Sequence, residues 1–280
     1  MPEPVDTALF SPPLQRNREP LQEPDSLCLL ARALFLHTDV NLSTVDPSPS
    51  RRRWELRKGW DLLLDGYWRE FESSGSEGQW PVVLKLKTYL PSWEAGPSDL
   101  NTWVVARAKK NYGKSREQLP AVVFITEDLS REALRDAYAE ADAFVLPTRG
   151  EGWGLPIAEA MAMELPVIVS LKLATNWSGP TAFLSSENSF ALPVAHYLPG
   201  GQAEPSVAVI RKQMRAVFED GNLAKRRGKQ AREDMVRRFS PDQSPDKFKN
   251  TKSKSSKIDI SVSKKLDSVI DREIAKCWKD

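Results

Sequence analysis

Glu151 and Glu159 are separated by seven residues in the stretch GEGWGLPIAEAMAMELPVIVS, residues 150–170. Glu151 lies in a glycine-rich turn, and Glu159 lies about one turn inside a helix that Pro156 can begin. A carboxylate accepts hydrogen bonds from two vicinal hydroxyl groups, such as those of ribose or a hexose. The two glutamates could therefore contact opposite ends of a nucleotide sugar.

The turn has the features of an anion site. Its glycines, Gly152 and Gly154 among them, let backbone N–H groups approach a ligand. The following helix presents its free N–H groups and the positive end of its dipole. The pattern matches neither the GxGxxG dinucleotide motif nor the GxxxxGK[ST] phosphate loop. A structural alternative stays open at this point: the glycines only reverse the chain, and the glutamate only favours the helix dipole.

Apolar strands alternate with helices around this turn. The expected strands are 80–89, 121–126, 143–147 and 166–170, and the expected helices are 59–71, 99–112 (capped by Asp99 or Asn101), 128–141 (capped by Ser130) and 155–164. An earlier apolar segment, Leu29–Leu36, is consistent with a strand or half a helix. This alternation indicates an α/β, Rossmann-like doubly wound domain, whose parallel sheet is covered on both faces. Ligands of such sheets bind outside the carboxyl ends of the strands, which is where this turn begins.

The chain divides into three parts. Residues 1–27 are expected to form a linker or arm, 28–240 a nucleotide-sugar-binding domain with an irregular loop at 38–52, and 241–280 a Lys/Ser-rich tail that can end in a helix. After Ser170 we expect a loop-rich stretch, followed by helices near 206–219 and 223–239. The tail stretch KFKNTKSKSSK has five lysines and no acidic residue. This composition is typical of a solvated, disordered tail, with contact to an acidic partner as the alternative.

Composition excludes several classes of function. The net charge of +2 gives no case for a nucleic-acid or membrane partner. Cys28 and Cys277 form neither a disulfide framework nor a metal spacing, which favours a reducing, cytoplasmic location. The N-terminus does not resemble a signal peptide, and the apolar run around Leu29–Leu36 is too short to span a bilayer. His37 and His196 are isolated and no D-x-D motif occurs, so we expect no metal and no other cofactor.

Residues 141–170, ADAFVLPTRGEGWGLPIAEAMAMELPVIVS, strongly resemble the donor-binding half of retaining glycosyltransferases of family 4, which have the GT-B fold and belong to glycosyl transferases group 1. The mark of that family is a pair of glutamates separated by seven residues, as Glu151 and Glu159 are. Weaker similarities extend over most of the chain from Val5 to about Phe239. They match VDTALFSP to the segment that joins the two domains, RRWELRKGWDLLLDGYWREF to the first strand-to-helix turn with its paired cations, and NWSGPTAFL and NSFAL to later loops.

The resemblance implies roles for the residues of the turn. Glu151 would contact the transferred sugar, and Glu159 would bind the ribose hydroxyls. The backbone N–H groups that would face the sugar and the diphosphate belong to Gly152, Trp153, Gly154 and Leu155.

Two cations ahead of the first long helix would neutralise the diphosphate. The matching residues are Arg53 and Lys58, with Arg57 as an alternative to Lys58. The base would stack at the end of the strand 121–126, against the backbone of Thr126. Taken alone, RRRWELRK would instead indicate a solvated basic loop.

The implied reaction transfers a hexosyl group from a GDP- or UDP-hexose with retention of configuration. Protein cations and the helix dipole would stabilise the leaving diphosphate in place of a metal, and the departing phosphate would help to activate the acceptor. A GT-B enzyme also needs an acceptor domain, and residues 1–27 are too few to form one. We expect a partner chain or a missing segment to supply it, docked on an exposed apolar patch that includes Trp153. The alternatives are a non-catalytic nucleotide-sugar-binding or regulatory module, and an interaction protein that uses the lysine-rich tail.

Overall fold

The computed structural model describes residues 4–13, 27–32, 56–72, 82–88, 100–171, 179–198 and 202–241. Outside these ranges lie the predicted loop 38–52, the candidate cation Arg53, the candidate cap Asp99 and the tail from residue 242 onward.

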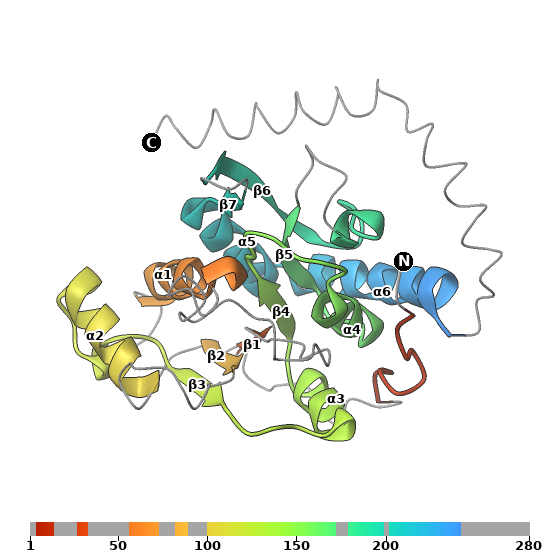
Figure 1. The fold of residues 1–280 in the computed structure, drawn as a ribbon, viewed down its shortest axis with the longest axis horizontal. Coiled ribbons are helices and arrows are strands. Elements are labelled where there is room, and N and C mark those ends of the chain that lie inside the picture. The colour runs from red at the N-terminus through yellow and green to blue at the C-terminus, as the bar shows by residue number, and fades with distance from the viewer. Residues whose placement is uncertain are drawn as a thin grey trace, which may run out of the picture. The chain divides into compact units, whose positions relative to one another are not determined.

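Seven strands of the described chain form one sheet in the order β3-β2-β1-β4-β5-β6-β7 (Figure 1). Their bounds are β1 Leu27–Arg32, β2 Val82–Lys87, β3 Val122–Ile125, β4 Ala143–Leu146, β5 Val167–Leu171, β6 Phe190–Tyr197 and β7 Ala203–Pro205. All neighbouring strands are parallel except β6 and β7. The order of β1 to β6 is that of the doubly wound fold, so the predicted α/β, Rossmann-like class is confirmed.

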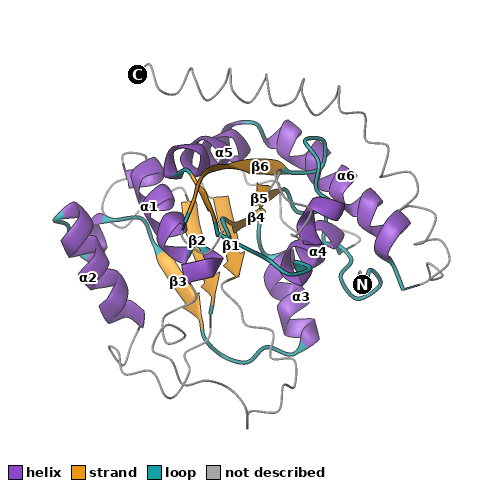
Figure 2. Cartoon of the chain, turned by 45° about the horizontal axis from the view of Figure 1, so that its top comes forward, coloured by secondary structure: helices purple, strands orange, loops and turns teal. Residues whose placement is uncertain are grey.

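Helices cover both faces of the sheet (Figure 2). They are α1 Trp60–Phe71, α2 Leu100–Tyr112, α3 Arg131–Ala139, α4 Leu155–Ala162, α5 Val207–Glu219 and α6 Gly221–Phe239. One cluster of buried side chains joins α1, α2 and α5 to one face, through residues such as Leu63, Val104 and Met214. On the other side of the sheet, α4 packs against α6. Helices α1 and α4 are therefore held by hydrophobic contacts on different sides of the sheet.

Helix ends follow local signals at several positions. The Ser130 hydroxyl accepts a hydrogen bond from the Ala133 N–H at 3.2 Å, which confirms the predicted cap of α3. Pro156 lies in the first turn of α4, where its missing N–H leaves no helical bond unmade. Asn101 lies inside α2, so the prediction of this residue as a cap is wrong.

The predicted loop-rich stretch after Ser170 contains two strands instead, β6 and β7. Pro193 lies within β6, and a proline usually argues against a strand because it cannot donate a ladder hydrogen bond. The outer half of β6 is also partly or fully exposed, so no clear apolar alternation marks it. Pairing with β5 on one side and β7 on the other decides its conformation.

The N-terminal segment Val5–Ser11 packs against the domain. Val5 and Phe10 are only 2% and 3% exposed, and the Val5 N–H donates to the carbonyl of Phe239 at the end of α6. The backbone N–H of Leu9 and the Arg131 guanidinium hold the pKa of the Asp6 carboxyl below its usual value. In Figure 1 this segment lies beside α3 and α6.

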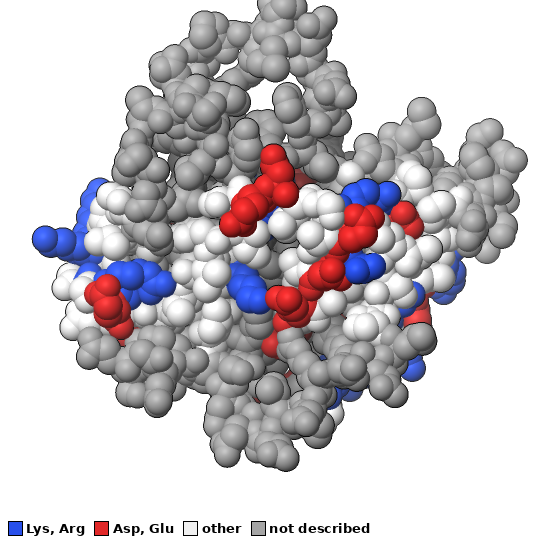
Figure 3. Space-filling model, turned by 90° about the horizontal axis from the view of Figure 1, so that it is seen from below, with Lys and Arg blue, Asp and Glu red and all other residues white. Residues whose placement is uncertain are grey.

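The described surface carries charges of both signs. On the face drawn in Figure 3, acidic and basic side chains lie among uncharged residues. Among the described helices, none combines the length and the apolar character that a membrane crossing requires.

Candidate functional site

Two turns at the carboxyl edge of the sheet form the candidate site. One precedes α1 and contains the short helix Leu56–Lys58; the other connects β4 to α4. The two turns meet because β4 pairs with β1, although β2 and β3 come between them in the chain. In doubly wound sheets, the crevice where the strand order reverses is the usual ligand site.

Gly59 brings the two turns into contact. It adopts a left-handed conformation with φ of 69°, and a Cβ atom built on it would lie 1.9 Å from the carbonyl oxygen of Pro147. The carbonyl of Arg57 then accepts the backbone N–H of Arg149 at 2.6 Å and the hydroxyl of Thr148 at 2.9 Å. Only glycine permits this approach, because any side chain would separate the turns.

Replacing Gly59 by alanine should therefore destabilise the protein. The left-handed conformation alone costs a non-glycine residue about 1–3 kcal/mol, and the collision with Pro147 adds to that. Thermal or urea unfolding measures the loss. Gly221→Ala is the control, because a Cβ at Gly221 meets no atom within 4 Å. Equal stability of both variants would show that the two turns are not held together at Gly59.

The Glu151 carboxylate lies against the cations of the first turn. Lys58 Nζ contacts Glu151 Oε1, and Arg57 Nη1 lies 3.2 Å from the same oxygen. The side chains of Lys58 and Glu151 are 5% and 6% exposed, whereas that of Arg57 is 36% exposed. Arg57 also donates to the Gly150 carbonyl at 2.6 Å. Both candidate cations of this turn thus converge on the first glutamate, with Lys58 the more buried.

The start of α4 forms the floor of the site. Gly154, with φ of 86°, precedes the helix, and Gly179 packs so closely on this turn that a Cβ there would lie 2.3 Å from the Gly152 carbonyl oxygen. Within the part of the chain that the structure describes, the N–H groups of residues 152–155 donate no hydrogen bond. Such N–H groups at a helix N-terminus are suited to binding an anion.

Glu159 is held from the neighbouring helix α3. The hydroxyl of Tyr138 donates to Glu159 Oε2 at 3.0 Å and lies 3.2 Å from the Pro156 carbonyl. Tyr138 is fully buried and was not among the predicted site residues. Tyr138 lies eighteen residues before Pro156, so no local pattern in the sequence indicates this contact.

Trp153 does not lie in an exposed apolar patch, so that expectation is wrong. Its ring packs edge-on against Phe183 and Phe239, with ring centroids 5.3 and 5.4 Å away. The exposed large hydrophobic residues of the described chain are Val105, Val123, Tyr197 and Val236. The indole instead anchors the turn to the end of α6, which leaves the backbone of the turn facing the site.

Thr126 follows the last residue of β3 and is exposed. It lies at the carboxyl edge of the sheet, but β2 and β1 separate β3 from β4. The structure therefore brings Glu151, Lys58 and the start of α4 together, and leaves Thr126 at a distance from them.

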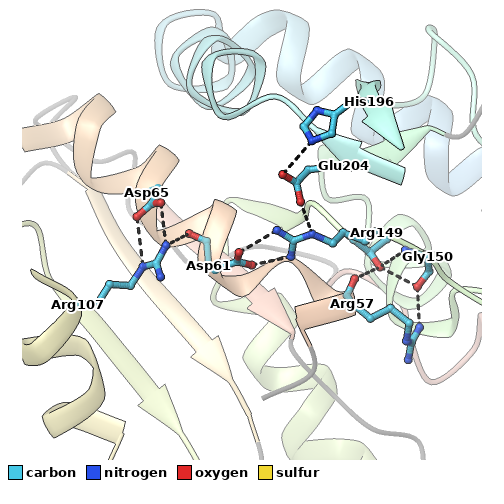
Figure 4. A network of polar contacts seen from close by, with 9 residues as sticks. Arg57, Asp61, Asp65, Arg107, Arg149, Gly150, His196 and Glu204 are labelled. Atoms are coloured by element: carbon cyan, nitrogen blue, oxygen red, sulfur yellow. Dashed lines mark hydrogen bonds and ion pairs between the residues drawn. The ribbon is translucent and has the colours of Figure 1, made fainter. Parts of the chain in front are cut away.

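A network of partly buried ion pairs lies behind the turn (Figure 4). Arg149, 5% exposed, makes two bonds of 2.7 and 2.8 Å to Asp61 in α1 and one of 2.6 Å to Glu204 in β7. Burial acts to lower the pKa of Arg149, but hydrogen bonds and charge from the two carboxylates outweigh it and raise the pKa above its usual value. His196 Nε2 lies 3.4 Å from Glu204, at the outer end of the network.

Arg149 therefore links three elements. It is two residues before Glu151, and its carbonyl accepts the Ala203 N–H of β7 at 3.0 Å. Arg149 was not among the predicted site residues, because an arginine in a glycine-rich turn is typical of a solvated surface. Among the described residues, no group of three His, Cys, Asp or Glu side chains is arranged to hold a metal ion.

Comparison with known proteins agrees with this fold. Residues 88–192 match the family model of glycosyl transferases group 1. The chain is 34% identical over 90 residues to the serotype-specific mannosyltransferase WbdA of Escherichia coli, an alignment that covers 30% of this chain and 11% of WbdA. The chain thus spans about a tenth of the length of that curated relative.

Solved structures show the same fold at low sequence identity. Sucrose-phosphate synthase from Thermosynechococcus elongatus has a TM-score of 0.56 and 18% identity, and the match covers 85% of this chain and 48% of that one. The Anabaena protein HepE, in complex with UDP and glucose, has a TM-score of 0.52 and 14% identity, over 85% of this chain and 51% of that one. This chain therefore corresponds in fold to about half of each structure.

Proposed function

We propose that this chain, which contains a glycosyl transferases group 1 domain, binds a nucleotide sugar and serves the transfer of its hexosyl group with retention of configuration. One observation carries the proposal: the buried contact of Lys58 with Glu151, beside an α4 N-terminus whose first N–H groups donate no bond among the described residues. This arrangement provides positive charge for a diphosphate and a carboxylate for sugar hydroxyls in one place.

The cations of the site are suited to stabilising the negative charge that develops on the leaving group. Departure of a nucleoside diphosphate leaves negative charge on its phosphate oxygens. Lys58, Arg57 and the dipole of α4 can stabilise that charge in a water-poor site. Glu151 keeps Lys58 in position before the donor arrives, because a buried ammonium needs an anionic partner. In this proposal the departing phosphate helps to activate the acceptor, and Glu151 positions the sugar.

In this proposal the nucleotide-sugar donor lies along α4, with its phosphates at the start of the helix and its nucleoside further along. Glu151 lies at the sugar end, and Glu159, one turn further into the helix, binds the ribose hydroxyls. The name of WbdA specifies mannosyl transfer, and the HepE structure holds UDP and glucose. We accordingly propose a GDP- or UDP-hexose donor and an acceptor-binding domain as partner, with the donor domain at residues 28–240 in a cytoplasmic protein. The base would lie at the end of β3 near Thr126.

A ligand screen by thermal shift tests the proposal. Nucleoside diphosphates and nucleotide sugars are the ligands, and a ligand at a hundred times its dissociation constant stabilises the folded state by roughly 2.7 kcal/mol. We expect GDP or UDP, and at least one of their hexose derivatives, to raise the melting temperature. Absence of any shift across the panel would contradict the proposal.

Replacing Glu159 by glutamine should weaken binding of the nucleoside diphosphate identified in that screen. A hydrogen bond to a charged group contributes about 1.5–3 kcal/mol, which corresponds to a loss of about ten- to a hundredfold in affinity. Calorimetry measures the loss, and the exposed Glu187→Gln serves as the control. Unchanged affinity would mean that Glu159 has only a structural role at the start of α4.

A further inference from the structure

We propose that Tyr138 is a positioning residue for Glu159, and that the N-terminal segment Val5–Ser11 braces Tyr138 from behind. The proposal rests on the proposed function, in which Glu159 binds ribose. It adds a hydroxyl on α3 and a distant segment of the chain to the machinery that recognises the nucleoside.

The hydroxyl of Tyr138 holds one oxygen of the Glu159 carboxylate. It donates to Oε2 at 3.0 Å and also faces the Pro156 carbonyl at 3.2 Å, so it bridges the first turn of α4 and the glutamate one turn along. A carboxylate has about four lone-pair directions on its two oxygens. The tyrosine occupies one direction on Oε2 and so limits the rotation of the carboxylate that would bind the vicinal hydroxyls of a ribose.

The ring of Tyr138 is itself held by packing. It is fully buried between Phe144 of β4 and Phe10, with ring centroids at 6.0 and 6.1 Å. The contact with Phe10 is edge-on, the arrangement that aromatic pairs prefer. A side chain locked in this way loses little conformational entropy when a ligand binds, which favours affinity.

The N-terminal segment is fastened on both sides of Phe10. Arg232 of α6 donates to the Phe10 carbonyl at 3.2 Å and to the Ser11 hydroxyl at 3.0 Å. The same guanidinium contacts the carbonyl of Ala162, the last residue of α4. The Asp6 carboxylate pairs with Arg131 of α3 at 3.0 Å. The segment thus joins α3, which carries Tyr138, to α4, which carries Glu159.

The test uses Tyr138→Phe in the full chain, because this change removes the hydroxyl and keeps the packed ring. We expect the affinity for GDP or UDP to fall about tenfold, while the affinity for inorganic pyrophosphate stays the same. Binding of a 2′,3′-dideoxynucleoside diphosphate should also stay the same, because it lacks the hydroxyls that Glu159 would bind. Tyr112→Phe is the matched control, since the Tyr112 hydroxyl bonds a different carboxylate, that of Asp65, at 3.1 Å.

A double-mutant cycle with Glu159→Gln separates this proposal from the proposed function. If Tyr138 acts through Glu159, Tyr138→Phe adds no further loss to Glu159→Gln. Additive losses, or an equal loss with pyrophosphate, would overturn the positioning role while leaving ribose binding by Glu159 intact. If neither GDP nor UDP binds the unaltered chain, the proposed function itself fails, and the role of Tyr138 fails with it.

Phe10→Leu tests the brace separately. We expect this variant to stay folded, because leucine fills much of the buried volume, and to show a smaller loss for GDP or UDP than Tyr138→Phe, again with no loss for pyrophosphate. Full retention of nucleotide affinity in Phe10→Leu would remove the N-terminal segment from the proposal.

Discussion

Purified by itself, the 280-residue chain is expected to bind a nucleotide sugar and to transfer no hexose. In the proposed function, the described residues supply groups for the phosphates, the ribose and the sugar, all at one edge of one sheet. Transfer also needs an acceptor hydroxyl held in line with the anomeric carbon and a site closed to water. Loss of such positioning can remove about 7–11 kcal/mol of barrier lowering, far more than contacts to the donor could replace.

Two assays on the same preparation check this expectation. Calorimetry with the nucleotide sugar measures binding, and product analysis with simple hexose acceptors measures transfer. Addition of an acceptor domain from a group 1 glycosyltransferase, either in trans or fused ahead of Val5, should restore transfer with retention. Robust transfer by the chain alone would contradict the expectation. Binding without any transfer, even after the domain is added, would favour a nucleotide-sugar-binding regulatory module.

Replacing Arg149 by alanine is expected to lower the free energy of unfolding by about 3–5 kcal/mol, the range observed when one partner of a buried ion pair is removed. Asp61 and Glu204 would remain as two carboxylates, with side chains only 16% and 19% exposed, facing the space that the guanidinium had filled. Because these residues come from α1 and β7, their repulsion would also separate the elements that flank the Glu151 turn.

Urea unfolding of the variant gives the size of the loss. Arg135→Ala is the control, because Arg135 pairs on the surface with its neighbour Asp136 and such pairs contribute about 0–1 kcal/mol. Asp61→Asn and Glu204→Gln, added to an Arg149→Met background, should recover much of the stability, since no unpaired charge then remains buried. A loss below about 1 kcal/mol in Arg149→Ala would show that water replaces the guanidinium at little cost.

Much of the fold could be predicted from the sequence, because its signals act between near neighbours. The alternation of apolar strands with helices indicates the doubly wound class, and Ser130 and Pro156 mark the starts of α3 and α4 through bonds made or avoided within one turn. β6 was not predicted, because the contacts that decide its conformation are not between near neighbours in the sequence. Its proline argues locally against a strand, and the neighbouring strand that overrides it comes from elsewhere in the chain.

The same distinction between local and long-range contacts applies to the candidate site. Local sequence was enough to place Glu151 in a glycine turn after a strand and Glu159 inside the next helix, because these positions depend on the turn and the helix alone. Which groups face those carboxylates depends on contacts between distant parts of the chain. Lys58 contacts Glu151 across 93 residues because β1 pairs with β4, Tyr138 faces Glu159 because α3 packs beside α4, and Arg149 is buried because α1 and β7 close over it. Such contacts depend on strand order and helix packing, which involve the whole chain and leave no pattern in the residues next to one another.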